Sequence, residues 1–340
     1  MLKALKSTVA GAAALLLVTT ATDARELRLS VETPPGHVRN LAAERWAEAI
    51  SDLTDGALSV TVFPAGQLYR APDAVRALAS GALDLSIQAS PTLSQLEPNL
   101  SVITLPMFFG ASRENVRAVL DGGAGQELWD MVARRGIVVP EGGHFEFAPN
   151  QTAFTTQPAA SYDELAGRVL ATPPSPVVVR MLQAMGLNPV ATPRTEIELQ
   201  LTQGQIVGMG SVTDLTISGG RLWEAGIRHA FNDNAGWGIY IPLASGRMLD
   251  SLPAEHRQAI HDAWGQVVDW ARDHTAEELE TARARNEAGG ITYADPSTEM
   301  VAEMRERMLA VQDEIVAGSG MDPAFVARVA EALAAAQATN

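Results

Sequence analysis

Apolar and polar positions form two alternating patterns early in the chain. Ser59–Phe63 alternates like a strand and includes β-branched residues, and Pro64 to Gly66 interrupts it. Ala71–Ser80 is rich in helix-forming residues and ends at Gly81, which suits the left-handed position after a helix. Leu83–Ile87 is again strand-like. Two strands joined by one helix make a βαβ unit, which is parallel and right-handed in nearly all proteins, so the chain is predicted to be α/β.

Further elements of the same kind flank this unit. Glu26–Glu32 is predicted as the first strand, and the turn TPPG leads into a helix. The apolar face of that helix consists of Val38, Ala42, Trp46, Ala49, Ile50 and Leu53. The pattern also predicts helices over Ala111–Leu120 and Gly125–Arg135 and a strand over Ile137–Pro140. A passage rich in glycine, phenylalanine and polar residues follows up to Thr156, where the chain is expected to cross into a second domain.

A second set of strands and helices follows and ends with a return to the first domain. The predicted elements are strand Arg168–Ala171, helix Pro176–Met185, strand Pro189–Ala191, helix Glu196–Gln203, strand Ile206–Met209 and strand Ile239–Ala244. Strands alternating with helices are typical of α/β domains. A prior of roughly 150 residues per domain divides the chain into two domains, each large enough for its own core.

The last third of the chain is predicted to be helical. Ser251 and Pro253 begin a helix that reaches toward Glu287, which is long for a globular protein. Prolines after Asp295 and Asp322 begin two more helices. The first of these two has an apolar stripe of Met300, Met304, Met308, Val311 and Ile315. We expect the methionines of this stripe to pack in the core.

The first residues have the layout of a secretory signal peptide. Lys3 and Lys6 precede an apolar run from Val9 to Val18, and small residues continue to Ala24. The run is too short to span a bilayer and lacks the amphipathic pattern of a surface helix. No later segment approaches the roughly 20 apolar residues of a membrane span. The mature protein is therefore expected to be soluble and to lie outside the cytoplasm.

Charge and cysteine content narrow the class of protein. The chain has 25 Lys and Arg residues against 40 Asp and Glu residues, which gives a net charge of −15. Nucleic acid is disfavoured as a partner because binding to phosphates requires lysine and arginine. The chain has no cysteine, so disulfides and thiolate metal ligands are excluded. Burial and hydrogen bonds must hold the exported fold together.

No arrangement of residues typical of an enzyme stands out. Gly208 and Gly210 follow a strand, but a dinucleotide fingerprint would need a third glycine where Thr213 stands. The same segment lacks the G-x-S-x-G frame of a nucleophile elbow. Two histidines could lie in a cleft, namely His37 at a helix start and His144 in the glycine-rich passage, but neither has a catalytic partner in the sequence. The remaining helical histidines lack the spacing of a zinc-binding pair: His256, His261 and His274.

An exported α/β protein with two domains and no reactive constellation fits a solute-binding clamp. In such folds the ligand lies at the carboxyl ends of strands, in the crevice between two lobes. Closure of the lobes around the ligand is then the mechanism.

Four segments resemble successive landmarks of the solute-binding proteins of tripartite ATP-independent periplasmic (TRAP) transporters. They lie in the family's order between Glu26 and Ala244, and their sequences are VFPAGQLYRAPDAVRALASGALDL, LPMFFGASRENVRAVLDG, YDELAGRVLATPPSPVVVRMLQAMGLNPV and ELQLTQGQIVG. The long helix after Ser251 resembles the family's domain-spanning helix. The resemblance implies a two-lobed periplasmic binding protein fold that captures a small solute and delivers it to membrane permease subunits. It implies no catalysis and neither a metal nor a redox cofactor.

The resemblance also implies a division of the chain. Residues 1–24 are expected to be the signal peptide, and residues 25–148 with about 237–250 the first lobe. Residues 149–236 are expected to form the second lobe. The helices of residues 251–340 are expected to bridge the lobes and pack on both.

Two of the family's usual ligand contacts are missing here. The family commonly has an arginine in a strand of the second domain, in a phrase like K-I-R-V-P, and its guanidinium pairs with the ligand carboxylate. The matching position in this chain is Ala171. A frequent asparagine contact falls on Ser211. Arg194 stands where the family often has an aromatic residue, so it is the candidate for a relocated guanidinium.

The resemblance places five further candidates near the ligand. Trp237 falls where the family often has a pocket aromatic, Glu32 ends the first predicted strand, and Gln88 ends the third. Phe145 and Glu146 lie in a passage that is longer than the family's usual one.

These residues permit two kinds of pocket. If Arg194 points inward, it holds a carboxylate, sulfonate or other anion through a charge-assisted pair of about 1.5–3 kcal/mol. If it points outward, Glu32, Asp214 or Glu146 beside Trp237 would hold an ammonium or zwitterion, with roughly 0.5–2 kcal/mol from cation–π contact. The family favours organic acids, and the absence of arginine at position 171 weakens that preference.

Two other roles are weighed against an importer subunit. A binding protein that serves a membrane sensor would lack permease genes beside its own. An exported enzyme on the same scaffold would need a nucleophile and a base facing the cleft, and the sequence offers no such pair.

Overall fold

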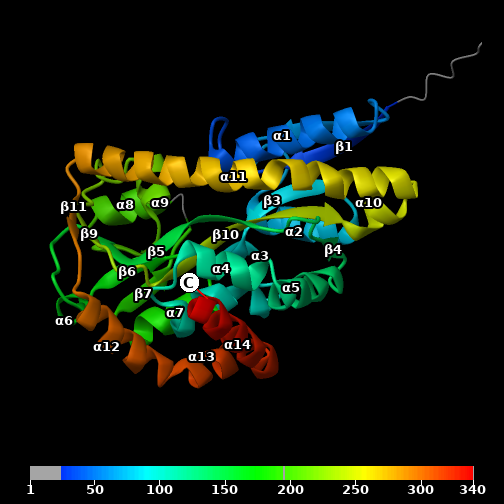
Figure 1. The fold of residues 1–340 in the computed structure, drawn as a ribbon. Coiled ribbons are helices and arrows are strands. Elements are labelled where there is room, and N and C mark those ends of the chain that lie inside the picture. Colours follow the sequence, from blue (N-terminus) through cyan, green and yellow to red (C-terminus); the bar gives the residue numbers. More distant parts are fainter. Residues whose placement is uncertain (1–23, 194–195, 340) are drawn as a thin grey trace, which may run out of the picture.

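One mixed sheet runs through the protein (Figure 1). In the computed structural model, which describes residues 24–193 and 196–339, the strand order is β2-β1-β3-β10-β5-β8-β6-β7, with β4, β9 and β11 attached beside this path. At one end, β1 (Arg25–Ser30) lies between β2 (Leu58–Phe63) and β3 (Leu85–Ala89), and all three are parallel. The crossovers are α1 (Val38–Leu53) and α2 (Ala71–Ser80). The predicted βαβ unit is confirmed.

The second half of the sheet repeats this arrangement. β6 lies between β7 and β8, and the three strands are parallel. The short strands β9 and β11 pair with each other, and β9 also pairs with β5. The elements are α6 (Tyr162–Leu165), β6 (Val169–Thr172), α7 (Pro176–Ala184), β7 (Asn188–Ala191), α8 (Ile197–Thr202), β8 (Gly208–Val212), α9 (Asp214–Gly219), β9 (His229–Phe231) and β11 (Thr292–Ala294).

Two long antiparallel strands join the halves. β10 (Gly236–Ser245) pairs with β3, with β4 (Ile137–Val138) and with β5 (Phe145–Thr155). The passage before Thr156, for which sequence analysis predicts no strand, is therefore the 11-residue strand β5. The polar side chains of β5 are buried and bonded to other protein groups. The strand therefore lacks the alternation of apolar and polar residues by which a strand is predicted. Gln151, for example, donates from Nε2 to Asn234 Oδ1 at 3.2 Å.

The register of this pair fixes where the strand ends meet. Tyr240 of β10 lies opposite Ala89, the last residue of β3, and also opposite Phe145 of β5. At the other end, Gln151 of β5 lies opposite Val212, the last residue of β8. The segment 145–151 of β5, with 236–240 of β10, thus connects the carboxyl ends of the two parallel sets over roughly 20 Å. We refer to these two segments as the crossing ribbon.

The 35-residue helix α11 (Ala254–Ala288) spans the molecule on one side of the sheet (Figure 1). It packs with α1 and with α10 (Gly246–Asp250) on the first half, and Trp46 of α1 meets Trp264 edge to face with ring centroids 5.5 Å apart. Trp264 Nε1 also donates to the carbonyl of Gly143 at 2.7 Å. The predicted long helix is confirmed, but its start is not as expected: Ser251 follows α10, and Pro253 is the N-terminal cap.

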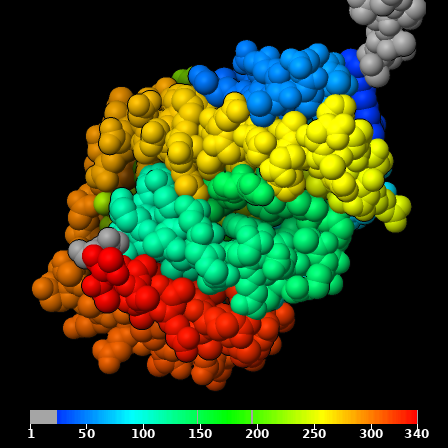
Figure 2. Space-filling view, turned by 45° about the vertical axis from the view of Figure 1, so that its right-hand side comes forward, coloured from blue at the N-terminus to red at the C-terminus, as the bar shows by residue number. Residues whose placement is uncertain are grey.

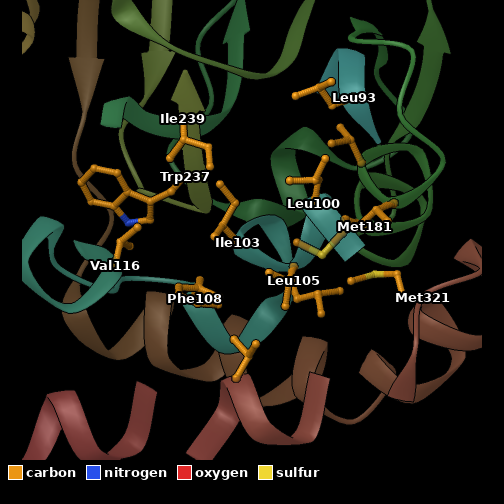
Figure 3. Close-up of a cluster of buried hydrophobic side chains, with 14 of the residues drawn as sticks. Leu93, Leu100, Ile103, Leu105, Phe108, Val116, Met181, Trp237, Ile239 and Met321 are labelled. Carbon is orange, nitrogen blue, oxygen red and sulfur yellow. The ribbon is translucent and has the colours of Figure 1, made fainter. Parts of the chain in front are cut away.

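A second group of helices covers the opposite side of the sheet (Figure 1). They pack around one large apolar cluster, part of which is drawn in Figure 3. These elements are α3 (Ser90–Leu93), the 3₁₀ helices η1 (Pro98–Thr104) and η2 (Pro106–Phe108), α4 (Arg113–Leu120), α5 (Gly123–Ala133), α12 (Thr298–Leu309), α13 (Gln312–Ser319) and α14 (Pro323–Thr339). Met304 and Met308 are buried in this cluster, as expected, although their stripe is split between α12 and α13.

A chain of ion pairs ties α11 to the first half. Arg272 of α11 is buried and donates through both terminal nitrogens to the Asp121 carboxylate at 2.7 and 3.0 Å. It also donates to the carbonyl of His144 at 3.1 Å. His144 Nε2 in turn lies 3.2 Å from Glu146 Oε1. Because one arginine satisfies a carboxylate and a carbonyl from two other segments, it fixes the position of α11 against α4 and β5.

The N-terminus of α1 has an unusual cap. His37 Nδ1 accepts a hydrogen bond from the backbone N–H of Arg39 at 3.1 Å. Burial and the neighbouring Arg39 charge lower the pKa of His37 to about 4. The cap needs a neutral ring, because a protonated Nδ1 has no lone pair to accept this bond.

This cap predicts a pH dependence of stability. The pKa of His37 is about 4 in the folded protein and about 6.5 in the unfolded chain. Between these values the unfolded chain binds a proton that the folded protein does not, so the contribution of His37 is complete above pH 6.5 and is lost as the pH falls toward 4. From pH 7 to pH 4.5 the loss is expected to be about 2 kcal/mol.

The measurement is urea unfolding at both pH values for the wild type and for His37→Asn, since asparagine caps a helix without titrating. The wild type should lose more stability than the variant on acidification. Equal losses would show that His37 does not carry this dependence.

Candidate ligand-binding site

Among the described residues, eight buried side-chain nitrogen or oxygen atoms lack a protein partner, and three of them lie at strand ends beside the crossing ribbon. These three are Arg39 Nη1, in the first turn of α1 after β1, Gln88 Oε1 near the end of β3, and Thr172 Oγ1 at the end of β6. The other five are Asn40 Oδ1, Arg113 Nη1, His144 Nδ1, Asn286 Oδ1 and Ser319 Oγ. Two of the three belong to the first half of the sheet and one to the second. Buried polar groups are normally hydrogen-bonded, so these atoms mark the place where another molecule would supply partners.

Arg39 is the buried cation of this region. Its side chain is only 2% exposed, and its Nη2 donates to Glu32 Oε1 at 3.0 Å. Its Nε lies 3.5 Å from Thr33 Oγ1, and its guanidinium lies over the Tyr240 ring, 5.0 Å from the centroid. The Nε and Nη2 edge of the guanidinium is therefore used by the loop between β1 and α1. Nη1 remains unpartnered.

Sequence reasoning missed Arg39. The residue follows the capping histidine and lies off the apolar face of α1, where a charged side chain is expected to be exposed. Its burial results from Tyr240, which β10 brings to the end of β3 from about 200 residues further along the chain. No local pattern in the sequence reports such a contact.

Gln88 is a candidate whose amide orientation follows from its neighbours. Ser86 Oγ donates to the carbonyl of Ser30 at 2.6 Å, so it must accept a hydrogen bond from Gln88 Nε2, which lies 2.7 Å away. The remaining Oε1 of Gln88 is a buried acceptor without a donor. A ligand hydroxyl or amide would be its natural partner.

Glu32 and Glu146, both proposed as ligand contacts, are paired within the protein. Glu32 is bonded to Arg39, with 40% of its side chain exposed. Glu146 is fully buried and accepts from Arg117 Nε at 3.1 Å and Nη2 at 2.9 Å. Burial alone would raise the pKa of Glu146, but the hydrogen bonds and charges of His144 and Arg117 lower it well below its usual range. Both carboxylates already have cationic partners within the protein.

The two aromatic candidates are part of the core. Phe145 is fully buried between Tyr240 and Trp264, with ring centroids 5.3 and 5.8 Å away. Trp237 packs near Ile239 and Val116 in the cluster of Figure 3, and its Nε1 donates to the carbonyl of Ala111 at 3.0 Å. The guanidinium of Arg113 lies 5.7 Å from the Trp237 ring centroid.

The candidates of the second half are dispersed. Ala171 is buried between β7 and β8. Ser211 has a left-handed φ of +54° and lines a cavity of about 10 Å³, which is room for about one water molecule. The Asp214 carboxylate accepts from Asn286 Nδ2 at 3.1 Å and from the Tyr293 hydroxyl, so it ties α9 to the end of α11. Arg194 lies outside the described residues, so its role stays a prediction.

A larger groove lies away from the strand ends. It has a volume of about 560 Å³ and runs between α5 and α11, where Asp121, Arg272 and Trp129 contribute to its wall. Figure 2 shows this face, with α11 in yellow above α4 and α5 in teal and green. The groove does not include any of the predicted ligand contacts.

The described residues contain no cluster of three or more His, Asp or Glu residues that could hold a metal ion. Among the same residues, no helix is both long and apolar enough to cross a bilayer. The predicted signal peptide, residues 1–24, lies outside the described residues except for Ala24.

Comparison with known proteins places the fold. Residues 29–319 match the family described as bacterial extracellular solute-binding protein, family 7. The C4-dicarboxylate-binding periplasmic protein DctP of Rhodobacter capsulatus is 24% identical over 311 residues, which are 90% of this chain and 91% of that protein.

Two solved structures share the architecture. A TRAP periplasmic solute-binding protein from Ochrobactrum anthropi, with its C-terminus bound in the ligand-binding pocket, has a TM-score of 0.84 and 22% identity, and the match covers 94% of this chain and 98% of that one. The sugar acid binding protein DctPAm of Advenella mimigardefordensis, in complex with galactonate, has a TM-score of 0.83 and 22% identity, with coverage of 92% and 99%. The predicted two-lobed fold is confirmed. The chain therefore belongs to family 7 of the bacterial extracellular solute-binding proteins, the TRAP type, and is a binding protein rather than an enzyme.

Proposed function

We propose that this chain is the periplasmic substrate-binding subunit of a TRAP-type importer. It captures a small organic acid between its lobes and delivers the acid to membrane permease subunits. The observation that carries the proposal is the set of unpartnered buried atoms on both sides of the crossing ribbon: Arg39 Nη1, Gln88 Oε1 and Thr172 Oγ1. Each such atom costs about 1–3 kcal/mol when it lacks a partner, and a bound solute would remove that cost.

The proposed lobes follow the division given by sequence analysis. Residues 25–148 with about 237–250 form the first lobe, residues 149–236 form the second, and the helices from residue 251 onward bridge them. The crossing ribbon supports this division, because it is the segment in which β5 leaves β10 and begins to pair with β8. A bend within this ribbon would bring the strand ends of the two lobes together around a solute.

The charges of the described residues favour an acid over an amine. An ammonium ligand would need a carboxylate without a cationic or donor partner. Glu32, Glu146 and Asp214, the three candidates for that role, are each paired within the protein. In contrast, Arg39 has an unused donor. The DctP relative is named for C4-dicarboxylates and the DctPAm structure holds galactonate, and both ligands are carboxylates.

Gln88 narrows the proposed class of acid further. Its unpartnered Oε1 accepts hydrogen bonds, and a carboxylate cannot donate one. A hydroxyl group on the solute would supply the donor. We therefore favour a hydroxy acid over an unsubstituted dicarboxylate.

Arg194 is the candidate for a second cation at the site. The alternative to import is that this protein binds its ligand for a membrane sensor. Purification of this protein with permease subunits would support import. Co-purification with a sensor alone would support the alternative.

A thermal-shift screen tests the proposed function. Galactonate and related hydroxy acids at millimolar concentration are expected to raise the melting temperature by several degrees, because a ligand that binds only the folded state stabilises it by mass action. The matched controls are galactitol, which lacks the carboxylate, and choline, which carries the opposite charge. A response to choline and none to any acid would contradict the proposal.

Thr172→Val tests the contribution of the second lobe. The substitution keeps the volume and removes a buried oxygen that has no protein partner, so the ligand-free protein should be as stable as the wild type or slightly more stable. Affinity for the acid identified in the screen should fall about 2- to 10-fold, as measured by calorimetry. Thr275→Val is the control, since Thr275 is equally buried but bonds within α11. Equal affinities of the two variants would exclude Thr172 from the site.

Closure is measured between labels on the two lobes. The chain has no native cysteine, so Ser80→Cys in the first lobe and Gln205→Cys in the second give the only labelling sites, and both positions are exposed. Saturating acid should shorten and narrow the distance distribution between the spin labels. The control pair, Glu48→Cys with Ser80→Cys, lies within the first lobe and should not change. If the distance between the labels on the two lobes is the same with and without the acid, the proposed closure is wrong.

A further inference from the structure

We propose that Arg39, at the start of α1, is the group that binds the carboxylate of the transported acid. This inference rests on the proposed function and assigns one residue within it. The sequence has alanine at position 171, where the family resemblance would place a ligand-binding arginine, and Ala171 is fully enclosed between strands. The cation for the ligand must therefore come from elsewhere in the fold.

The burial of Arg39 is the first observation. A guanidinium that is 2% exposed loses nearly all of its hydration, so its N–H groups need partners from the protein or from a ligand. Within the protein, Nη2 reaches Glu32 and Nε lies at the limit of hydrogen bonding to Thr33. Nη1 has no partner. Arg113 Nη1 is also unpartnered, but Arg113 is only partly buried, so Arg39 is the fully buried arginine with an unused donor. This unused donor on a buried cation points to an anionic ligand.

The fixed orientation of the guanidinium is the second observation. The guanidinium lies over the Tyr240 ring, 5.0 Å from its centroid, while Glu32 binds Nη2 and Thr33 accepts from Nε. The group is thus oriented before any ligand arrives, which lowers the entropic cost of binding. Nη1, which carries two N–H groups and has no protein partner, is left for the ligand carboxylate.

The helix end adds to the attraction for an anion. Arg39 lies in the first turn of the 16-residue helix α1, whose N-terminus carries partial positive charge. His37 caps this end through its unprotonated Nδ1 and packs edge-on against Tyr240, with centroids 6.0 Å apart. The residues at this end of α1 are therefore arranged around one cation and one helix terminus. Glu32 is the only carboxylate that contacts the Arg39 guanidinium among the described residues.

Two substitutions with opposite expected effects test the assignment. Arg39→Gln removes the charge and should weaken galactonate binding about 10- to 100-fold, the value of one charge-assisted hydrogen bond. Glu32→Gln removes the competing carboxylate and frees Nη2, so it should strengthen binding several-fold. Arg45→Gln, on the same helix with its guanidinium stacked over Trp270, is the control and should bind as the wild type does.

Isothermal calorimetry with galactonate and with galactitol separates recognition of charge from a structural role. Arg39→Gln should lose the preference for galactonate over galactitol, whereas a variant that is merely misfolded would lose both ligands and show altered circular dichroism. Arg39→Lys, which restores the charge with less precise geometry, should recover part of the affinity if Arg39→Gln folds poorly.

The outcomes distinguish this inference from the proposed function. If the wild type binds an acid and Arg39→Gln binds it within twofold, the assignment is overturned while the proposed function stands. A loss of binding in Arg194→Ala with none in Arg39→Gln would transfer the role to Arg194. If no acid binds the wild type at all, both proposals fail.

Discussion

The antiparallel pairing of β5 with β10 is the constraint on which the rest of the structure depends. β10 pairs with strands of the first half and β5 with strands of the second half, so the register of this single pair decides which strand ends face each other. It also brings Tyr240 to the end of β3 and beneath the guanidinium of Arg39. A slip of one residue would turn every side chain of the pair to the opposite face of the sheet. The register therefore has to be specified by burial on both faces, and β10 is buried along its whole length.

Most of the buried charged groups described above are paired with an opposite charge inside the protein. This strongly acidic protein keeps several ionic groups out of water and pairs them with groups of opposite charge, such as Arg272 with Asp121 and Glu146 with Arg117. Such pairs position segments more than they stabilise the fold, because desolvation offsets much of their Coulomb attraction. Arg39 differs in that one of its nitrogens stays unpaired. The unpaired nitrogen of Arg39 is therefore available to a ligand, whereas the carboxylate of Glu146 is occupied within the fold.

Local sequence patterns predicted the architecture because its elements are specified locally. The βαβ unit around α2, the left-handed Gly81 and the long helix α11 each follow from spacing, capping and composition within a few turns. The strand β5 was not predicted from the sequence pattern. Its two faces contact different helices and its polar residues are bonded inside the protein, so the alternation of apolar and polar residues that marks a half-buried strand does not appear.

The sequence by itself determined the fold class, the family and the absence of an enzymatic site, since these depend on short motifs and residue types. It could also name residues near strand ends, such as Gln88 and Glu32, because a strand end is a local feature. It could not determine which of those side chains are already occupied. That Glu146 is bonded to Arg117 and Asp214 to Asn286, whereas Arg39 retains a free donor, was decided by tertiary structure alone. The physical reason is that hydrogen bonding and burial depend on neighbours that are distant along the chain, and only folding brings those neighbours together.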